Sequence, residues 1–413
     1  MIFIAAASRN VEARKVKNLL VISSAVHYSH DGCLFSYAPY VREIDLWADL
    51  FPELSIAAPC RNEPSPPDCV PFTRSNISIR PQIVTGGDAL AAKLNQTLLL
   101  PALIFGLCRA MLRAEAIHVR CPGNLGLLGV ALAPLFSRHL VAKYAGQWNG
   151  YPGEPLTWRW QRALLGSRWW RGPVTVYGDW PNQPPHIVPF FTSVLNQQQA
   201  ERARIAASRR SLGFADGRAL RVLFVGRLSA AKNVNAILDA VTRLKSREIK
   251  IECDIVGEGP ERARLERQAE ELGVSDRVNF AGGVDFDQAL DFYEQADVLA
   301  LVSETEGWPK AIAEAMAFGL ICIGSDRGLT PTMLGEGRGI VVPPGDAEAL
   351  AEALSRIVEN PEQCVEMAVR AAAWSRRYSL EGLQRAISEM LTERWQIPIG
   401  LHSDQPVLKQ SSL

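Results

Sequence analysis

The chain has 413 residues, of which 47% are hydrophobic and 21% charged, and its formal net charge is zero. This length excludes a single ordinary core and predicts two domains, while the composition is that of a soluble globular protein without a nucleic-acid partner. The charge is uneven, because residues 1–195 carry 18 Lys and Arg against 12 Asp and Glu, whereas residues 196–413 carry 26 against 32. Either the first half meets an anionic lipid or phosphate, or solvated charges are distributed by chance.

The eight cysteines include no CxxC pair, which indicates neither a zinc site nor a disulfide framework. Cys253 and Cys322 lie within apolar runs, where reduced thiols act as small core residues. We therefore expect a cytoplasmic protein, with the inner face of the membrane as an alternative location. The opening MIFIAAA is too short for a signal-peptide core, and residues 1–17 are interpreted as a loose leader.

Short apolar runs alternate with longer amphipathic ones, which predicts an α/β chain with parallel sheets. In the first half, strands are expected at residues 18–25, 116–120, 139–145 and 173–178, the last being the final strand of that half. The polar stretch 197–220 then places a domain boundary near residues 190–200.

A loop is expected between the first strand and the first helix, at AVHYSHDGCLFSY, residues 25–37. Gly32 would let the backbone approach a ligand there. His27 or His30 could take a proton from an acceptor hydroxyl, and the alternative is a loop histidine without a role. His118, inside an apolar strand, is expected to be a satisfied core residue.

Two runs in the first half are rich in apolar or aromatic residues. Residues 98–112 are too few for a spanning helix and end in Arg109 and Arg113, so we predict a buried core helix. Residues 157–172, TWRWQRALLGSRWWRG, combine Trp and Arg, which favours peripheral contact with a membrane headgroup or a phosphate-bearing acceptor. An exposed packing patch is the alternative.

The second half predicts six strands with helices between most of them. They are expected at residues 221–226, 251–257, 277–282, 297–303, 320–325 and 339–342. Such a doubly wound domain binds its ligand outside the carboxyl ends of its strands. We expect a first domain over 18–195, a second over 196–380, a helix over 381–396 that packs back on the first domain, and a disordered tail over 397–413.

The most informative stretch is ETEGWPKAIAEAMAFG, residues 304–319. Pro309 suits a first helical position, which puts Glu306 in the loop before the helix and Glu314 about one and a half turns along it. Gly307 and Trp308 would expose backbone N–H groups at the helix start. Two carboxylates beside such donors suit the hydroxyls and anionic oxygens of a sugar nucleotide.

Cations follow the strand at 221–226, in GRLSAAKN. Gly226 allows a tight strand exit, and Arg227 and Lys232 would stabilise a diphosphate leaving group, although such loop cations are often only solvated. Gly257 and Gly259 follow the next strand and would give a nucleobase or phosphate room, with a plain strand–helix turn as the alternative.

Two further polar positions are expected to cap helices. Asn233 should cap the helix after the cation loop. Asp285 and Asp287 form a DxD pattern that binds metal in some sugar-nucleotide enzymes. Here Asp287 is instead expected to cap the following helix, so no metal site is predicted.

From about Arg221 to Ala353 the chain resembles the large retaining glycosyltransferase family with the GT-B fold, the glycosyl transferases group 1 type. The motifs that carry this resemblance, in order, are GRLSAAKN, VGEGPERARLE, VNFAGGV, the spaced Glu306 and Glu314, EAMAFGLICIGSD and GIVVPPGD. It implies two Rossmann-like doubly wound domains facing across a cleft, the second holding the nucleotide sugar.

The resemblance also implies roles for single residues. Arg227 and Lys232 would bind the diphosphate, Glu306 and the Gly307–Pro309 loop would contact the donor sugar, and Glu314 would bind the ribose. Transfer would retain stereochemistry and need no metal or other cofactor, with the leaving phosphate helping to deprotonate the acceptor.

Two departures from the family pattern stand out. Many relatives have a histidine where this chain has Ala145, and Gln147, His27 and His30 are candidates for its role. An acidic residue common after Asp326 is also missing, since Thr330-Pro331-Thr332 stands there.

These features together predict a glycosyltransferase that moves a hexose from a nucleoside diphosphate sugar to a hydroxyl of a polysaccharide or lipid-linked acceptor. One alternative is a sugar-nucleotide epimerase on the same scaffold. The other is a non-catalytic nucleotide-sugar-binding partner, which the missing histidine makes conceivable.

Overall fold

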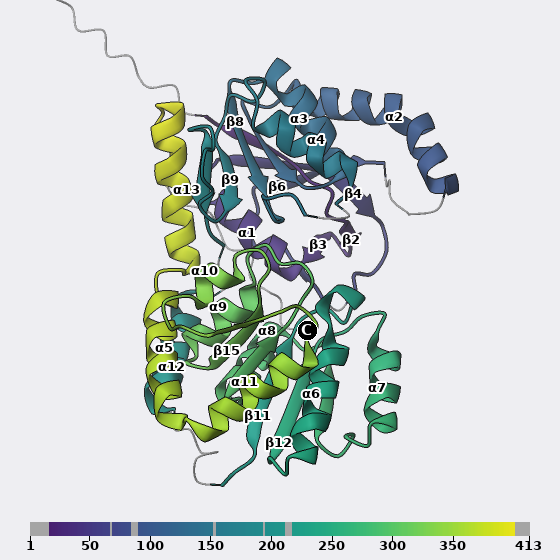
Figure 1. Ribbon diagram of the computed structural model, residues 1–413. Coiled ribbons are helices and arrows are strands. Elements are labelled where there is room, and N and C mark those ends of the chain that lie inside the picture. Colours follow the sequence, from purple (N-terminus) through teal and green to yellow (C-terminus); the bar gives the residue numbers. More distant parts are fainter. Residues whose placement is uncertain are drawn as a thin grey trace, which may run out of the picture.

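The protein is described by a computed structural model that covers residues 16–66, 68–83, 90–151, 154–192, 195–210 and 217–400. Two sheets, one above the other in Figure 1, each form the centre of a domain. Residues 1–15 of the predicted leader and residues 401–413 of the predicted tail lie outside the described residues. The tail was predicted to be disordered from residue 397, but Ile399 is buried in the core of the first domain.

The first domain contains a ten-stranded sheet among its described residues. Its elements are β1 (Asn18–Ile22), β2 (His27–His30), β3 (Cys33–Tyr37), α1 (Ala38–Ala48), β4 (Glu53–Arg61), β5 (Cys69–Pro71), β6 (Ile77–Gln82), α2 (Leu90–Met111), β7 (Ala116–Cys121), α3 (Asn124–Leu132), the 3₁₀ turn Ala133–Leu135, β8 (His139–Tyr144), α4 (Leu156–Leu165), β9 (Val174–Tyr177) and β10 (Ile187–Phe190). The parallel part runs β10-β9-β8-β7-β1-β4-β6, which is a Rossmann-like order.

Two expectations for this sheet were wrong. The stretch after β1 is not a loop but the antiparallel hairpin β2–β3, which pairs onward with β5. Asp31 and Gly32 form its turn with positive φ angles of 49° and 76°, a conformation that a glycine adopts without strain. The strand at 174–177 is also not the last, because β10 follows and pairs with it in parallel.

The second domain has a six-stranded parallel sheet among its described residues. Its elements are α5 (Gln197–Arg209), β11 (Leu220–Val225), the 3₁₀ turn Ala230–Lys232, α6 (Val234–Ser246), β12 (Ile251–Val256), α7 (Arg262–Glu271), β13 (Val278–Gly282), α8 (Phe286–Gln295), β14 (Val298–Leu301), α9 (Lys310–Ala317), β15 (Ile321–Ser325), α10 (Thr330–Leu334), β16 (Ile340–Val342), α11 (Ala347–Glu359), α12 (Pro361–Ser375) and α13 (Leu380–Trp395). All six strands match the predicted ones.

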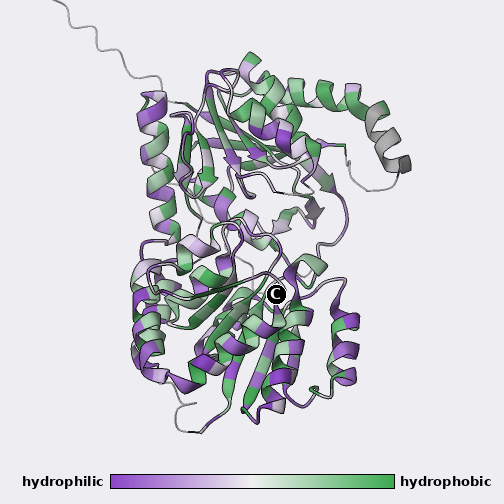
Figure 2. Ribbon diagram, viewed as in Figure 1, coloured by the Kyte–Doolittle hydropathy of each residue, from purple (hydrophilic) through white to green (hydrophobic). Residues whose placement is uncertain are grey.

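The strand order of this sheet is β13-β12-β11-β14-β15-β16, so the chain reverses direction across the sheet between β11 and β14. In a doubly wound sheet, the crevice outside such a switch point is where ligands bind. The loops after β11 and β14 therefore meet at the position that the fold provides for a ligand. Figure 2 shows the apolar residues concentrated on the strands of both sheets.

Helix α13 leaves the second domain and runs along the first (Figure 1). Its Leu383, Ile387 and Leu391 side chains are buried in the core that surrounds β1, β4 and α1. At its start, the Leu380 N–H donates to Leu195 O at 3.0 Å. The helix thus follows the second domain in the chain but packs against the first domain, and so holds the two together.

Two sequence expectations about the first-domain surface needed correction. Helix α2 buries Leu103, Leu107 and Met111, yet Leu98 and Phe105 are 76% and 71% exposed, so it is a surface helix and not a buried core helix. Within residues 157–172, Trp160 and Trp169 are exposed whereas Trp170 is buried in the core. No helix among the described residues is long and apolar enough to cross a membrane.

Candidate functional site

The loops after β11 and β14 are joined by an ion pair between Lys232 and Glu306. The ammonium nitrogen of Lys232 lies 2.6 Å from Glu306 Oε1. Glu306 is buried and Lys232 is about one quarter exposed. The two residues that were expected to bind the diphosphate and the donor sugar therefore lie side by side at the switch point of the second sheet.

Asn233 fixes the same two loops to each other. It has a left-handed backbone, with φ of 51°, and its side chain does not cap α6 as expected. Instead, Asn233 Nδ2 donates to Val302 O at 3.1 Å and to Glu304 Oε1 at 2.9 Å. The capping prediction was wrong because these acceptors on the neighbouring loop hold the amide.

Helix α9 begins at Lys310, one residue later than predicted, with Pro309 in the cap position before it. Glu314 is buried on this helix, and its Oε2 accepts a hydrogen bond from the Tyr293 hydroxyl at 2.7 Å. Burial raises the pKa of the Glu314 carboxyl, and the Tyr293 bond and the Lys310 charge partly counter that rise. Glu306 and Glu314 thus have different partners and do not share a proton.

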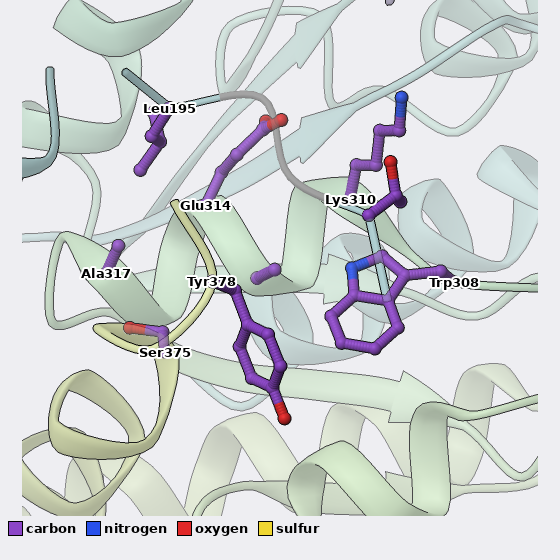
Figure 3. Close-up of a pocket in the computed structure, with 9 residues that line it drawn as sticks. Leu195, Trp308, Lys310, Glu314, Ala317, Ser375 and Tyr378 are labelled. Carbon is purple, nitrogen blue, oxygen red and sulfur yellow. The ribbon is translucent and has the colours of Figure 1, made fainter. Parts of the chain in front are cut away.

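Lys310 belongs to the same site but was not singled out from the sequence. Figure 3 shows the Lys310 and Glu314 side chains extending to one side, with the rings of Trp308 and Tyr378 on the other. The cavity among them is about 20 Å³, room for roughly one water molecule. Trp308 and Thr192 both line it, and the buried Trp308 Nε1 and Thr192 Oγ1 have no protein partner.

Gly257 and Gly259 have a structural explanation, whereas a Cβ on Gly226 would meet only the Phe224 ring, at 3.3 Å. A Cβ on Gly257 would lie 1.9 Å from Gly226 O, and one on Gly259 would lie 2.1 Å from Leu228 O. The turn after β12 therefore packs directly against the cation loop, and only glycine fits there. Arg227 in that loop is exposed and, among the described residues, forms no ion pair.

The first domain faces this site through the ends of β8 and β9. A Cβ on Gly307 would lie 3.1 Å from the Tyr177 ring and 3.3 Å from Ala145 O. The position where relatives have a histidine is thus in contact with the loop that carries Glu306. Nearby Gln147 has a buried Oε1 without a protein partner.

The two histidines of the β2–β3 hairpin are placed differently from each other. His27 is buried, its Nδ1 bonds Ala25 O at 3.0 Å, and burial lowers its pKa to about 4. A base with so low a pKa is poorly matched to proton transfer near neutral pH. His30 is exposed and lies 3.1 Å from the Asp31 carboxylate.

A buried charge cluster opposite Lys310 was also missed. Glu43 accepts from Arg120 Nη1 at 2.7 Å and from Lys143 Nζ at 2.7 Å, which holds the pKa of Glu43 well below its ordinary value despite its burial. Arg120 and Lys143 are register partners on β7 and β8, near the carboxyl ends of those strands. The signal in the sequence for this cluster was a basic residue near the end of each of two otherwise apolar strands.

Two other expectations were corrected by side-chain contacts. His118 is buried on Trp47, with ring centroids 4.2 Å apart, but neither of its nitrogens has a hydrogen-bond partner in the protein. Asp285, not Asp287, caps α8, and Asp287 instead accepts from Gln199 Nε2 at 3.0 Å. Within the described ranges, no three His, Cys, Asp or Glu side chains are grouped as a metal would require.

Residues 206–374 match the family model described as Glycosyl transferases group 1. D-inositol 3-phosphate glycosyltransferase of Corynebacterium urealyticum is 31% identical over 175 residues, which are 40% of this chain and 41% of the relative. Alpha-D-kanosaminyltransferase of Streptomyces kanamyceticus is 29% identical over 202 residues, 48% of this chain and 52% of the relative. These matches span about half or less of the relatives' length.

Three solved structures resemble nearly the whole chain. Sucrose-phosphate synthase from Thermosynechococcus elongatus has a TM-score of 0.67 and 20% identity, covering 92% of this chain and 99% of its own. Anabaena HepE in complex with UDP and glucose has a TM-score of 0.63 and 16% identity, and the match covers 92% of this chain and 100% of HepE. WaaG, a glycosyltransferase involved in lipopolysaccharide biosynthesis, has a TM-score of 0.60 and 14% identity, and the match covers 91% of this chain and 99% of WaaG. At these identities the likeness establishes the fold, which is the two-domain GT-B arrangement.

Proposed function

We propose, from the match of residues 206–374 to the family model described as Glycosyl transferases group 1, that the protein moves a hexose from a nucleoside diphosphate sugar to a hydroxyl of a polysaccharide or glycolipid. The observation that carries the proposal is the Lys232–Glu306 pair at the switch point of the second sheet. A cation for the diphosphate and an acceptor for sugar hydroxyls lie there within one hydrogen bond of each other.

In the proposed reaction, the bond between the anomeric carbon and the diphosphate oxygen breaks, and a bond to the acceptor oxygen forms with retained stereochemistry. Arg227 and Lys232 stabilise the negative charge that grows on the leaving diphosphate. The acceptor proton passes to the departing diphosphate. No metal or other cofactor takes part in this scheme.

Glu314 is proposed to bind the donor ribose. Its carboxylate is already oriented by Tyr293, and a diol would replace the water that it loses on burial. HepE, a neighbour in fold, binds UDP and glucose, so uridine diphosphate sugars are the first donors to test.

A peripheral membrane contact through residues 157–172 is also proposed, in a revised form. Because Trp170 is buried, the contact rests on Trp160 and Trp169 with the exposed Arg159 and Arg168. Replacing Trp160 and Trp169 by Ser should reduce co-sedimentation with anionic vesicles. Unchanged co-sedimentation would remove this segment as the contact.

The function is tested by incubating the full chain with a panel of uridine, guanosine and adenosine diphosphate sugars, with and without a bacterial glycan and glycolipid extract. Release of nucleoside diphosphate that requires the extract, with labelled sugar in the product, supports transfer. A new epimer formed without the extract would support the epimerase alternative. Binding without turnover in any extract would support the non-catalytic alternative.

A further inference from the structure

A cavity of about 340 Å³ lies at the amino ends of strands in the first sheet. It is away from the loops after β11 and β14, which are called the donor loops from here on. Its walls come from residues at the amino ends of three neighbouring parallel strands: Arg138 and His139 at β8, Arg171 three residues before β9, and His186 directly before β10. The Lys232–Glu306 site, by contrast, faces the carboxyl ends of the same strands. The two sites are therefore on opposite edges of the sheet.

The end of α13 closes this cavity. Arg394 Nη2 donates to Pro185 O at 3.0 Å, and Trp395 Nε1 donates to Leu140 O at 3.1 Å, so both side chains are fixed by backbone acceptors of the first domain. The Trp395 ring lies 5.4 Å from the His139 ring. The cavity thus has a built wall of two rings and an anchored guanidinium.

Positive charge in this cavity is not balanced by carboxylates. Arg138, Arg171 and Arg394 all line it, and no Asp or Glu is among its lining residues. Within the described part of the chain, none of the three guanidinium groups forms an ion pair, and only Arg394 has a hydrogen-bond acceptor. Three like charges around one concavity repel one another and raise the local positive potential, which favours a bound anion.

We propose that this cavity binds the phosphate group of a small phosphate ester, in a site separate from the sugar-transfer site. Guanidinium groups match phosphate oxygens in pairs, and the rings of Trp395 and His139 offer a surface for the attached organic part. The volume is at the lower end of the range for ligand pockets, which fits one phosphate with a small substituent. The phosphate belongs either to a free metabolite or to a phospholipid headgroup.

Occupation of the site has a structural consequence. Because α13 starts at the second domain and its last turn closes the cavity, a bound anion adds contacts to the end that is packed on the first domain. A ligand that binds only the folded chain stabilises it by mass action. The ligand should therefore raise the unfolding temperature of the whole protein.

The test titrates inorganic phosphate and glycerol 3-phosphate into the full chain, read by calorimetry and by unfolding temperature. Arg171→Gln and Arg138→Gln change exposed side chains and should keep the fold, whereas each should weaken binding about tenfold or more. Arg385→Gln, an exposed arginine on α13 that does not line the cavity, is the matched control and should bind as the natural chain does. Lys232→Ala removes phosphate binding at the donor loops and should leave this site intact.

Vesicles of phosphatidylglycerol, compared with phosphatidylcholine, distinguish the two sources. Binding of glycerol 3-phosphate that is lost in Arg171→Gln assigns a free phosphate ester. Binding to phosphatidylglycerol alone, also lost in Arg171→Gln and kept in Arg385→Gln, assigns a lipid headgroup. The proposal is overturned if neither probe binds, or if binding survives Arg138→Gln and Arg171→Gln but is lost in Lys232→Ala.

Discussion

Lys232 and Glu306 are 74 residues apart in sequence, and their side chains are joined by a 2.6 Å ion pair. They meet because β11 and β14 are neighbours at the switch point of the second sheet. Under the proposed function, a bound diphosphate would compete with Glu306 for the Lys232 ammonium and release the carboxylate for sugar hydroxyls. The two side chains of the ion pair would then separate when a donor binds.

Lys232→Ala should reduce transfer by about 100-fold or more, because it removes a cation aimed at charge that develops in the transition state. It should also lower stability by roughly 1–3 kcal/mol, since a buried carboxylate loses its partner. Steady-state kinetics and urea unfolding measure the two effects. Lys250→Ala, which changes an exposed lysine bonded to Gly217 O, is the control. Full activity of Lys232→Ala would rule out the assigned role.

Glu314→Gln should abolish donor binding yet make the protein more stable at neutral pH. Burial raises the pKa of Glu314 in the folded state, so across the interval above its unfolded pKa the folded chain holds the extra proton and stability falls as pH rises. The neutral amide escapes that loss and still accepts the Tyr293 hydrogen bond. Urea unfolding at pH 7.5 should therefore favour the variant. At pH 4 the two proteins should have nearly equal free energies of unfolding. A difference that is the same at pH 4 and pH 7.5 would contradict the explanation.

Lys310→Met should stabilise the protein at pH 7. Burial lowers the pKa of Lys310 to about 8, while Glu43 and Glu314 raise it and Lys143 and Arg120 lower it further. Between pH 8 and the unfolded pKa near 10.5 the unfolded chain binds more protons, so the natural protein gains stability as pH rises. The advantage of the variant should shrink over that interval. Lys245→Met, at a half-buried surface lysine that pairs with Asp276, should show no such trend.

His27→Phe should leave transfer largely intact. The ring stacks on Phe72 and meets the edge of Tyr40, contacts that phenylalanine keeps. With a pKa of about 4, His27 makes the natural protein lose stability as pH falls from about 6.5 towards 4, because only the unfolded chain gains the proton there. The free energy of unfolding, measured at pH 7 and at pH 5, should fall less between these two values in the variant than in the natural protein. A large fall in kcat with the fold retained would instead place His27 at the acceptor.

Much of the structure of the second domain could be predicted from local sequence. Alternating apolar runs fixed all six strands of the second sheet, because buried parallel strands read as short hydrophobic segments and need no knowledge of their neighbours. The glutamates at 306 and 314 were placed in the loop before α9 and on the helix itself, since proline and helical spacing are local constraints.

Errors arose where a distant segment decided the outcome. The β2–β3 hairpin looked like a loop, because its pairing with β4 and β5 is formed between segments separated in sequence. Asn233 was expected to cap a helix, and its amide is held by Val302 O and Glu304 instead. Half of α2 was expected in the core, but the body of the domain covers only one face of it.

The amino-acid sequence by itself determined the α/β class, the strands of the second domain and the residue types of the donor loops, since these depend on periodicity and turn chemistry. Only the tertiary structure decided which charges meet. It paired Lys232 with Glu306, buried Glu43 between Arg120 and Lys143, and brought Arg394 to Arg138 and Arg171. The reason is physical: the Coulomb energy of a pair depends on distance and burial in space, and neither is written in the spacing along the chain.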